Sequence, residues 1–333
     1  MSSKTLQEWT GAAHSRILAY GVSRGDLVVG NEALVGPIDS SDEWIRQRTG
    51  IIERHRASEN VSVQDLARAA AEQAIDRSPV TADRIDAVIV STVSFPYQTP
   101  SLASWLAGQL GTTAAAYDIS AACAGFCYAL AQADALIRSG AAHYVLIDAA
   151  EKLSDLVDPT DRSISFLLGD AAGAAVVGPS DEPGVSATIW GSDGEHWPTI
   201  RMTDSLLAFR DGKCAWPTLR QEGRTVFRWA VQDMAHAAQH IIDAAGLTAD
   251  DIDVFVPHQA NERIIDEFIK HLGLRPDVVV GRDIVHSGNT SAASIPLATA
   301  ALLDAGEAKS GDLCLQIGFG AGLVYAGQVV VLP

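Results

Sequence analysis

The organisation of this chain follows from the segment Asp118-Ile-Ser-Ala-Ala-Cys-Ala-Gly-Phe-Cys-Tyr-Ala-Leu-Ala-Gln-Ala-Asp-Ala-Leu-Ile137. A short strand over 114–118 is predicted to pass through small residues into an Ala-rich helix with apolar positions at helical spacing. Cys123 falls at this strand-to-helix turn, where unpaired N–H groups and the helix dipole favour a thiolate, the reactive form of cysteine. The alternative is a buried core cysteine, which is the more common environment for this residue.

Sequence on either side indicates an internal duplication. Val63-Gln-Asp-Leu-Ala-Arg-Ala-Ala is similar to Val231-Gln-Asp-Met-Ala-His-Ala-Ala, and Thr81-Ala-Asp-Arg-Ile-Asp is similar to Thr248-Ala-Asp-Asp-Ile-Asp. The two pairs keep nearly the same spacing, and the period is the size of a domain. Helices alternate with buried strands in each copy, as is typical of an α/β fold with a parallel sheet. We therefore expect two duplicated α/β halves, 1–178 and 179–333, joined within 178–184.

Two further motifs belong to the second half. His258, in Val256-Pro-His-Gln-Ala-Asn261, directly follows a buried strand, the position at which open α/β sheets place reactive groups. Asn289, in Gly288-Asn-Thr-Ser-Ala-Ala-Ser294, leads the last Ala-rich helix, which the duplication makes the counterpart of the Cys123 helix. The three side chains are therefore expected to converge between the halves. Taken singly, His258 is more often a structural histidine and Asn289 a helix N-cap, and His286 is interpreted as local structure.

Composition restricts the class of protein. The chain has 333 residues, 47% of them hydrophobic, and a formal net charge of −17, which argues against a general nucleic-acid binder. Its four cysteines have no metal-ligand spacing, and no apolar run is long enough to span a membrane. The N-terminal segment carries Lys4 and Glu8 without the apolar core of a signal peptide. We expect a cytoplasmic protein without a metal site.

Two segments favour binding of a phosphate-bearing ligand. Residues 40–50 predict a capped helix that places Trp44 and Arg48 on one face, either as simple packing or as a platform for a planar ligand. Residues 209–228 are basic, which is either a solvated charge run or a surface for a carrier protein or coenzyme A phosphates. Their charged side chains are Arg210, Lys213, Arg220, Arg224 and Arg228, against Asp211 and Glu222.

In combination, these motifs resemble the ketoacyl-acyl-carrier-protein synthase III family, which has the thiolase fold. The resemblance extends over residues 14–333 and rests on AACAGF around Cys123, PHQAN around His258, GNTSAAS around Asn289 and GFGAG near the C-terminus. It implies a layered α-β-α-β-α arrangement and a homodimer that needs no cofactor. It also implies acylation of Cys123 by an acyl-CoA primer, followed by decarboxylative condensation with malonyl-acyl carrier protein, to start fatty-acid or polyketide synthesis. A priming ketosynthase of an aromatic polyketide pathway is one form of this function.

The resemblance assigns roles residue by residue. Cys123 is the acyl-accepting nucleophile, His258 and Asn289 are its catalytic partners, and the amides of Cys123 and Ala321 form the oxyanion hole. Related enzymes often carry Gly at the position of Ala321. The remaining assignments are coenzyme A binding by Trp44, Arg48 and Arg162, carrier-protein docking by Arg263, and an acyl pocket that includes Thr99, contributed across the dimer. The basic run 209–228 adds Arg224 as a further candidate for carrier-protein docking.

The residue types suit this chemistry. A thiolate stores the acyl group as a covalent intermediate, and two donors stabilise the enolate formed when the malonyl group loses CO₂. The alternatives are a chalcone-synthase-like type III polyketide synthase, which also uses Cys, His and Asn, and a non-catalytic thiolase-fold partner subunit.

Overall fold

The computed structural model describes residue 6 and residues 9–333. Lys4 and Glu8, which supported the argument against a signal peptide, lie outside the described residues. Within the described part, no helix combines the length and the apolar character needed to cross a membrane.

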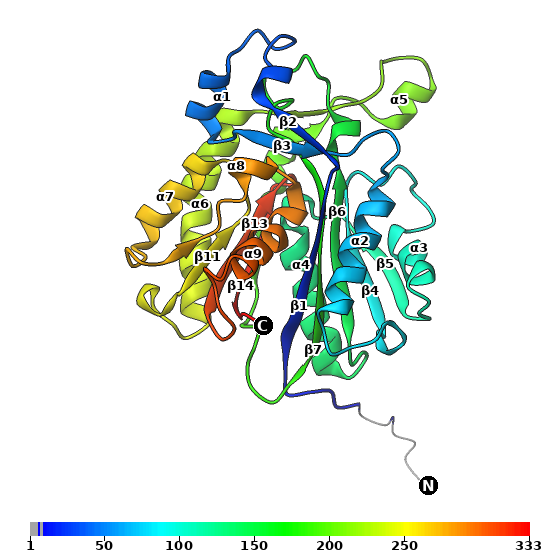
Figure 1. The fold of residues 1–333 in the computed structure, drawn as a ribbon, viewed down its shortest axis with the longest axis vertical. Coiled ribbons are helices and arrows are strands. Elements are labelled where there is room, and N and C mark those ends of the chain that lie inside the picture. Colours follow the sequence, from blue (N-terminus) through cyan, green and yellow to red (C-terminus); the bar gives the residue numbers. More distant parts are fainter. Residues whose placement is uncertain (1–5, 7–8) are drawn as a thin grey trace.

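Two five-stranded sheets form the framework (Figure 1). The first has the order β1-β7-β6-β4-β5, with bounds His14–Arg24, Asp170–Ser180, Val145–Lys152, Ala87–Ser91 and Ala115–Ile119. The second has the order β8-β14-β13-β11-β12, with bounds Ile189–Ser192, Val324–Val331, Leu313–Gly320, Val254–Pro257 and Val279–Val280.

The two sheets repeat one pattern of strand directions. In the first, β1 and β6 run antiparallel to β7, whereas β4 and β5 continue parallel to β6. In the second, β8 and β13 run antiparallel to β14, whereas β11 and β12 continue parallel to β13. The matching sequence segments lie in corresponding helices: the first begins α2 (Val63–Asp76), and the second, from Val231, lies within α6 (Gly223–Ala244). This repetition supports the duplicated halves, and their boundary at 178/179 stays a prediction.

Helices cover both sheets and fill the space between them. The main ones are α2 (Val63–Asp76), α3 (Leu102–Gln109), α4 (Gly125–Ser139), α6 (Gly223–Ala244), α7 (Glu262–Leu272) and α9 (Ser294–Asp304). Side chains of α2 and α3 pack on the outer face of the first sheet, and those of α6 and α7 pack on the outer face of the second. Helices α4 and α9 lie between the sheets, so the layers follow the order α-β-α-β-α (Figure 1). The predicted thiolase-like α/β architecture is confirmed.

The inner layer is one continuous core. A single cluster of buried residues includes Phe126 and Ile147 from the first half together with Val254 and Ile295 from the second. Small residues allow this close approach: a Cβ added to Gly173, on β7 of the first half, would lie 2.5 Å from the Pro296 Cγ on α9 of the second. The Ala-rich composition of the two central helices therefore reflects how closely they pack.

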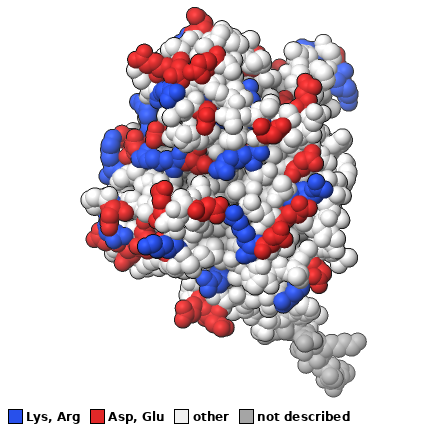
Figure 2. Space-filling model, in the orientation of Figure 1, with Lys and Arg blue, Asp and Glu red and all other residues white. Residues whose placement is uncertain are grey.

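Smaller elements surround one end of this framework. Helix α1 (Asp42–Thr49) begins at Ser41, whose side chain accepts a hydrogen bond from the Trp44 N–H, and it ends at Gly50 with φ of 78°, as the sequence predicted. The others are α5 (Leu206–Arg210), α8 (Ile284–Ser287), the ribbon of β2 (Leu27–Gly30) and β3 (Glu53–Arg56), and the ribbon of β9 (Ile200–Met202) and β10 (Leu219–Gln221). Acidic and basic side chains are interspersed on the face shown in Figure 2.

Candidate active site

A cavity of about 1150 Å³ opens at this end of the molecule. Its walls include residues from the strand-to-helix turns of both halves and from the β9–β10 ribbon. Nine of the ten predicted site residues line it: Trp44, Arg48, Cys123, Arg162, Arg224, His258, Arg263, Asn289 and Ala321. Thr99 does not; it lies exposed between β4 and α3. Its predicted place in an acyl pocket therefore requires a second copy of the chain.

Cys123 lies in a 3₁₀ turn, Ala122–Ala124, which connects β5 to α4. Ala122 adopts a left-handed backbone with φ of 45°, and Ser291, in the equivalent turn Ser291–Ala293 before α9, has φ of 53°. Non-glycine residues in this region are strained and often mark functional sites. Strand β13 packs against the first turn so closely that a Cβ on Gly320 would lie 3.1 Å from the Cys123 sulfur. The adjacent Ala321 is thereby held at the nucleophile.

The protonation state of Cys123 differs from the sequence expectation. Burial of the sulfur raises the pKa of Cys123 to about 12; a hydrogen bond with Ser291 opposes this rise, and the nearby Glu151 carboxylate adds to it. The residue is only partly buried as a whole, because its sulfur borders the cavity. Burial thus shifts the pKa of Cys123 in the direction opposite to the one that the sequence argument expected from the strand-to-helix turn. If Cys123 acts as a nucleophile, a proton acceptor must therefore take the proton of its thiol.

His258 is a buried, neutral imidazole. Its Nδ1 lies 2.8 Å from the Ser294 Oγ, which also accepts a hydrogen bond from the Gln259 N–H at 3.2 Å. The Ser294 Oγ already accepts the Gln259 N–H, so the hydroxyl hydrogen of Ser294 can point to the Nδ1 of His258. Nδ1 then acts as the acceptor, and the ring hydrogen of His258 is on Nε2. Burial lowers the pKa of His258 to about 3, and the ring packs edge-on against Phe319 at 5.3 Å between centroids. His258 is therefore arranged as a neutral hydrogen-bond donor.

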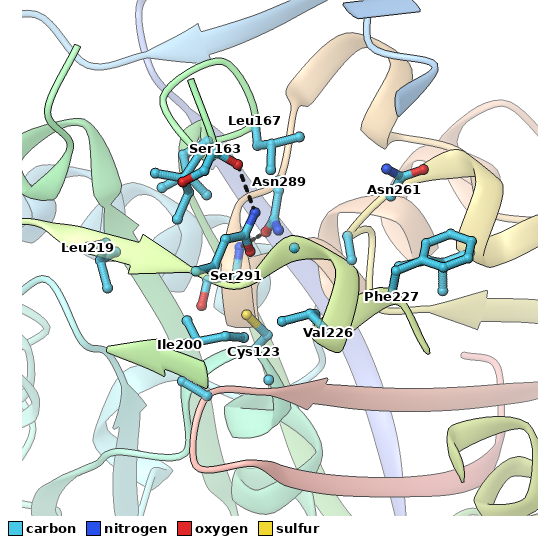
Figure 3. Close-up of a pocket in the computed structure, with 18 of the residues that line it drawn as sticks. Cys123, Ser163, Leu167, Ile200, Leu219, Val226, Phe227, Asn261, Asn289 and Ser291 are labelled. Atoms are coloured by element: carbon cyan, nitrogen blue, oxygen red, sulfur yellow. Dashed lines mark hydrogen bonds between the residues drawn. The ribbon is translucent and has the colours of Figure 1, made fainter. Parts of the chain in front are cut away.

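Asn289 is fixed by its backbone and by one side-chain atom. Its N–H donates to the Leu167 carbonyl at 2.8 Å, and its Oδ1 accepts from the Ser291 N–H at 2.9 Å. Among the described residues, its Nδ2 has no acceptor, and Asn289 lines the cavity beside Cys123 and Ser291 (Figure 3). The helix N-cap alternative is wrong, because the N-cap positions of the turn Ser291–Ala293 and of α9 are Thr290 and Ala293. The Asn289 side chain instead closes a local turn through Oδ1, which leaves its Nδ2 as a donor. His286, by contrast, is exposed and lies 3.1 Å from Glu53, outside the cavity lining.

The outer part of the cavity is aromatic and cationic. The guanidinium groups of Arg48 and Arg162 lie 4.7 and 4.8 Å from the centroid of the Trp44 ring. On the facing wall, the guanidinium of Arg263 lies 5.4 Å from the Phe227 ring, and Arg224 is exposed on the same helix as Phe227. This end suits a planar group that bears phosphates.

Sequence reasoning missed several residues of the site. Ile200, Leu219 and Val226 add apolar surface to the cavity that Cys123 also lines (Figure 3). These residues gave no sequence signal, because their ribbon and helix are remote from the catalytic motifs. Glu151 could have been noticed as an acid near the carboxyl end of a strand that also carries Asp148 and Lys152, and Ser291 lay inside a motif already quoted.

Comparisons with known proteins agree with this geometry. Residues 117–194 match the sequence pattern described as 3-oxoacyl-[acyl-carrier-protein (ACP)] synthase III, and residues 242–332 match its C-terminal counterpart. A protein of Kocuria rhizophila named beta-ketoacyl-[acyl-carrier-protein] synthase III is 53% identical and is covered over 99% of each chain. One of the same name from Streptomyces glaucescens is 54% identical over 97% of this chain and 98% of that protein.

Solved structures show the same relationship. The crystal structure of a priming beta-ketosynthase from a polyketide biosynthetic pathway superposes with a TM-score of 0.95, at 43% identity and with 99% of each chain covered. A beta-ketoacyl-[acyl-carrier-protein] synthase III from Thermus thermophilus has a TM-score of 0.89 at 41% identity, covering 96% of this chain and 99% of that one.

Proposed function

This chain belongs to the beta-ketoacyl-[acyl-carrier-protein] synthase III family, and from that premise we propose how its cavity carries out the reaction. The protein is an acyltransferase that condenses an acyl-CoA primer with malonyl-acyl carrier protein and so starts fatty-acid or polyketide synthesis. The observation that supports the site assignment best is the presence of Cys123, His258 and Asn289 in the lining of one cavity.

In the first half-reaction, the Cys123 sulfur attacks the thioester carbonyl of the primer. The C–S bond to coenzyme A breaks, and the acyl group remains on Cys123. The backbone N–H groups of Cys123 and Ala321 stabilise the oxyanion; Ala321 follows the strand end that packs against the sulfur, and a backbone donor tolerates alanine where relatives carry glycine.

In the second half-reaction, the malonyl thioester loses CO₂ and negative charge develops on its thioester oxygen. The Nε2–H of His258 and the Nδ2–H of Asn289 donate to this oxygen, and the resulting carbon nucleophile attacks the acyl-Cys123 carbonyl. The new C–C bond forms as the C–S bond to Cys123 breaks, and the released thiolate takes up a proton to restore the free thiol. Two neutral donors suit the task, because the charge exists only after decarboxylation. The substrates supply all the chemical groups needed, so we propose that no cofactor takes part.

The mouth of the cavity holds the carriers. Trp44, Arg48 and Arg162 bind the adenine and phosphates of coenzyme A, and the exposed Arg224 and Arg263 contact the carrier protein. Local positive charge offsets the acidic total of the chain at this place. A cytoplasmic homodimer completes the proposal, with Thr99 of each chain directed into the partner's acyl pocket.

Trp44→Ala is expected to raise the KM for acyl-CoA about tenfold with little change in kcat. Loss of a stacking and cation–π surface of about 1–2 kcal/mol weakens binding without altering the reacting groups. Steady-state kinetics with acetyl- and butyryl-CoA measure this effect. The matched control is Trp197→Ala, since Trp197 is exposed and outside the cavity lining. An unchanged KM in Trp44→Ala would remove Trp44 from the coenzyme A site.

Thr99→Phe is expected to shorten the preferred primer. The added ring occupies space that terminal methylenes fill, and each buried methylene contributes about 0.8 kcal/mol whereas overpacking costs roughly 1–3 kcal/mol. The wild type should prefer primers of three or more carbons over acetyl, and the variant should reverse this order. The measurement is kcat/KM for acetyl-, propionyl-, butyryl- and hexanoyl-CoA in both proteins. The same ranking in both would show that Thr99 does not limit the pocket.

The function itself is tested by product analysis. Each acyl-CoA is incubated with malonyl-acyl carrier protein, and the carrier-bound product is identified by mass spectrometry. One condensation per primer, with the β-ketoacyl group on the carrier protein, is expected. Repeated condensation of malonyl-CoA without a carrier protein would instead indicate a type III polyketide synthase, and absence of acyl-Cys123 would indicate a non-catalytic subunit.

A further inference from the structure

Arg54, on β3, is a fully buried arginine beneath the aromatic and cationic end of the cavity. Its Nη1 donates to the Val29 carbonyl at 3.0 Å, and its Nη2 donates to the Asn31 Oδ1 at 2.7 Å and to the Phe166 carbonyl at 2.8 Å. All three acceptors are neutral oxygens. Burial lowers the pKa of Arg54 to about 10, so the guanidinium is still charged at neutral pH. A buried cation with neutral acceptors is costly, and its place here points to a use beyond packing.

Asn31 extends these contacts to helix α1. The residue is fully buried, and its Nδ2 donates to the Asp42 Oδ1 at 2.7 Å and to the Ile51 carbonyl at 2.9 Å. Asp42 is the first residue of α1, and Ile51 follows the end of this helix. Arg54 is therefore connected through one side chain to both ends of α1, which lies beside β2 and β3 in Figure 1.

Phe166 connects the same guanidinium to the facing loop. Its ring packs edge-on against the Trp44 ring, with 5.2 Å between the centroids, and both rings line the cavity. Arg162, four residues earlier, places its guanidinium 4.8 Å from the Trp44 centroid. The helix and the loop that form the mouth thus meet at Trp44, and Arg54 donates to a group from each side.

These segments pack in a hydrophobic cluster separate from the large cluster between the two sheets. Its buried members include Ile45 of α1, Ile51, and Ile164 and Phe166 of the loop, and Trp44 packs against them. Loss of the Arg54 hydrogen bonds should therefore loosen the mouth of the cavity more than the sheets or the turn at Cys123.

We propose that Arg54 is a positioning residue for coenzyme A, a role that rests on the proposed function. Its three hydrogen bonds keep α1 and the loop 163–168 at the spacing in which Trp44, Arg48 and Arg162 bind the adenine and phosphates together. Arg54 does not line the cavity, so it acts only through these groups. A planar guanidinium holds its donors in fixed directions and can bridge several segments, whereas the ammonium of a lysine is a point charge.

Acylation of Cys123 by two donors with the same acyl group tests this role. Butyryl-CoA carries the adenine and phosphates, whereas the butyryl thioester of N-acetylcysteamine lacks them. Arg54→Gln should lower the acylation rate constant with butyryl-CoA at least about tenfold and leave that with the short thioester within about twofold. Intact-protein mass spectrometry of single-turnover reactions gives both rates. Calorimetric titration with free coenzyme A should show a similar loss of affinity without any reaction.

The half-reaction is chosen to keep the test specific. The Asn289 N–H donates to the Leu167 carbonyl, next to Phe166, so condensation would also respond to a shift of the loop. Acylation precedes the step in which Asn289 is proposed to act. Thermal unfolding of each variant checks that it is folded.

Two further variants and a control complete the experiment. Arg54→Lys should resemble Arg54→Gln, because one ammonium cannot replace the three-way bridge. Asp42→Ala removes the Asn31 contact at the start of α1 and should give a smaller loss that is again confined to butyryl-CoA; this partly exposed residue decides the test if the Arg54 variants do not fold. Arg275→Gln is the matched control, since Arg275 also donates to a backbone carbonyl, that of Ile252 at 3.3 Å, but lies outside the cavity lining.

The results distinguish this role from the function on which it rests. An equal loss with both donors in Arg54→Gln would show a purely structural role, and an unchanged preference for butyryl-CoA would show none; either result overturns the proposal. Full recovery in Arg54→Lys would overturn the three-way bridge. A wild-type protein that does not bind free coenzyme A and reacts equally with both donors would instead count against the proposed coenzyme A site.

Discussion

Cys123→Ala is expected to reduce self-acylation from acyl-CoA to the level of the buffer reaction. The acyl group needs a nucleophilic sulfur at the oxyanion hole, and no other thiol of the described chain lies there. Cys127 and Cys314 are fully buried in the core, where burial raises the pKa of both thiols, and Cys214 lies in the segment between α5 and β10. Intact-protein mass spectrometry after incubation with a radiolabelled or heavy acyl-CoA measures the covalent adduct.

The control separates loss of the nucleophile from loss of the fold. Cys127→Ala changes a buried thiol on the same helix and should keep full acylation. Cys123→Ala should still decarboxylate malonyl-acyl carrier protein, because His258 and Asn289 remain in place. Adducts on Cys214 in the Cys123→Ala protein would refute the assignment of the nucleophile.

His258→Ala and Asn289→Ala are each expected to slow condensation about 100-fold or more while affecting acylation less. Removing one donor to a developing oxyanion typically costs about 3–4 kcal/mol of barrier, and the enolate oxygen develops charge only in the malonyl half-reaction. Single-turnover acylation and malonyl decarboxylation are measured separately. Because the pKa of His258 is lowered to about 3, the ring stays neutral from pH 5 to 9 and should add no inflection to the condensation profile there.

His286→Ala serves as the control for these variants, since that imidazole is exposed and faces Glu53. Asn289→Ala also removes the acceptor for the Ser291 N–H, so its acylation rate should suffer somewhat more than that of His258→Ala. Equal losses in both half-reactions for His258→Ala would mean that the histidine chiefly activates the thiol.

Local sequence signals predicted the elements well. The repeated segment that starts at Val63 forms helix α2 (Val63–Asp76), and the structure gives this helix a capping box between Ser62 and Asp65. The nucleophile strand was expected over 114–118 and is found at Ala115–Ile119. The repeat made the helices that follow Cys123 and Asn289 counterparts of each other. The sequence alone therefore predicted that these two residues lie close together. These features depend on spacing and capping, which a sequence contains directly.

The ionisation of the site could not be predicted in the same way. The pKa of Cys123 depends on desolvation by surrounding elements and on contacts with Glu151 and Ser291, which come from other parts of the chain. The sequence argument considered only the helix terminus, which lowers the pKa of the thiol, and could not include the burial that raises it. Thr99 illustrates a second limit, since the role proposed for it lies across an interface and depends on contacts that a single chain does not contain.

The core shared by the two halves has a consequence during synthesis. The residues of the first sheet and of α4 are all synthesised before those of the second sheet. In the folded protein, Phe126 and Ile147 pack against α9 and the second sheet, so this apolar face stays uncovered until the rest of the chain is made. At translation rates of about 5–20 residues per second, this interval lasts roughly 8–30 s. For that time the nascent half carries an exposed apolar surface, and it is then that the protein is most open to aggregation and most in need of a chaperone.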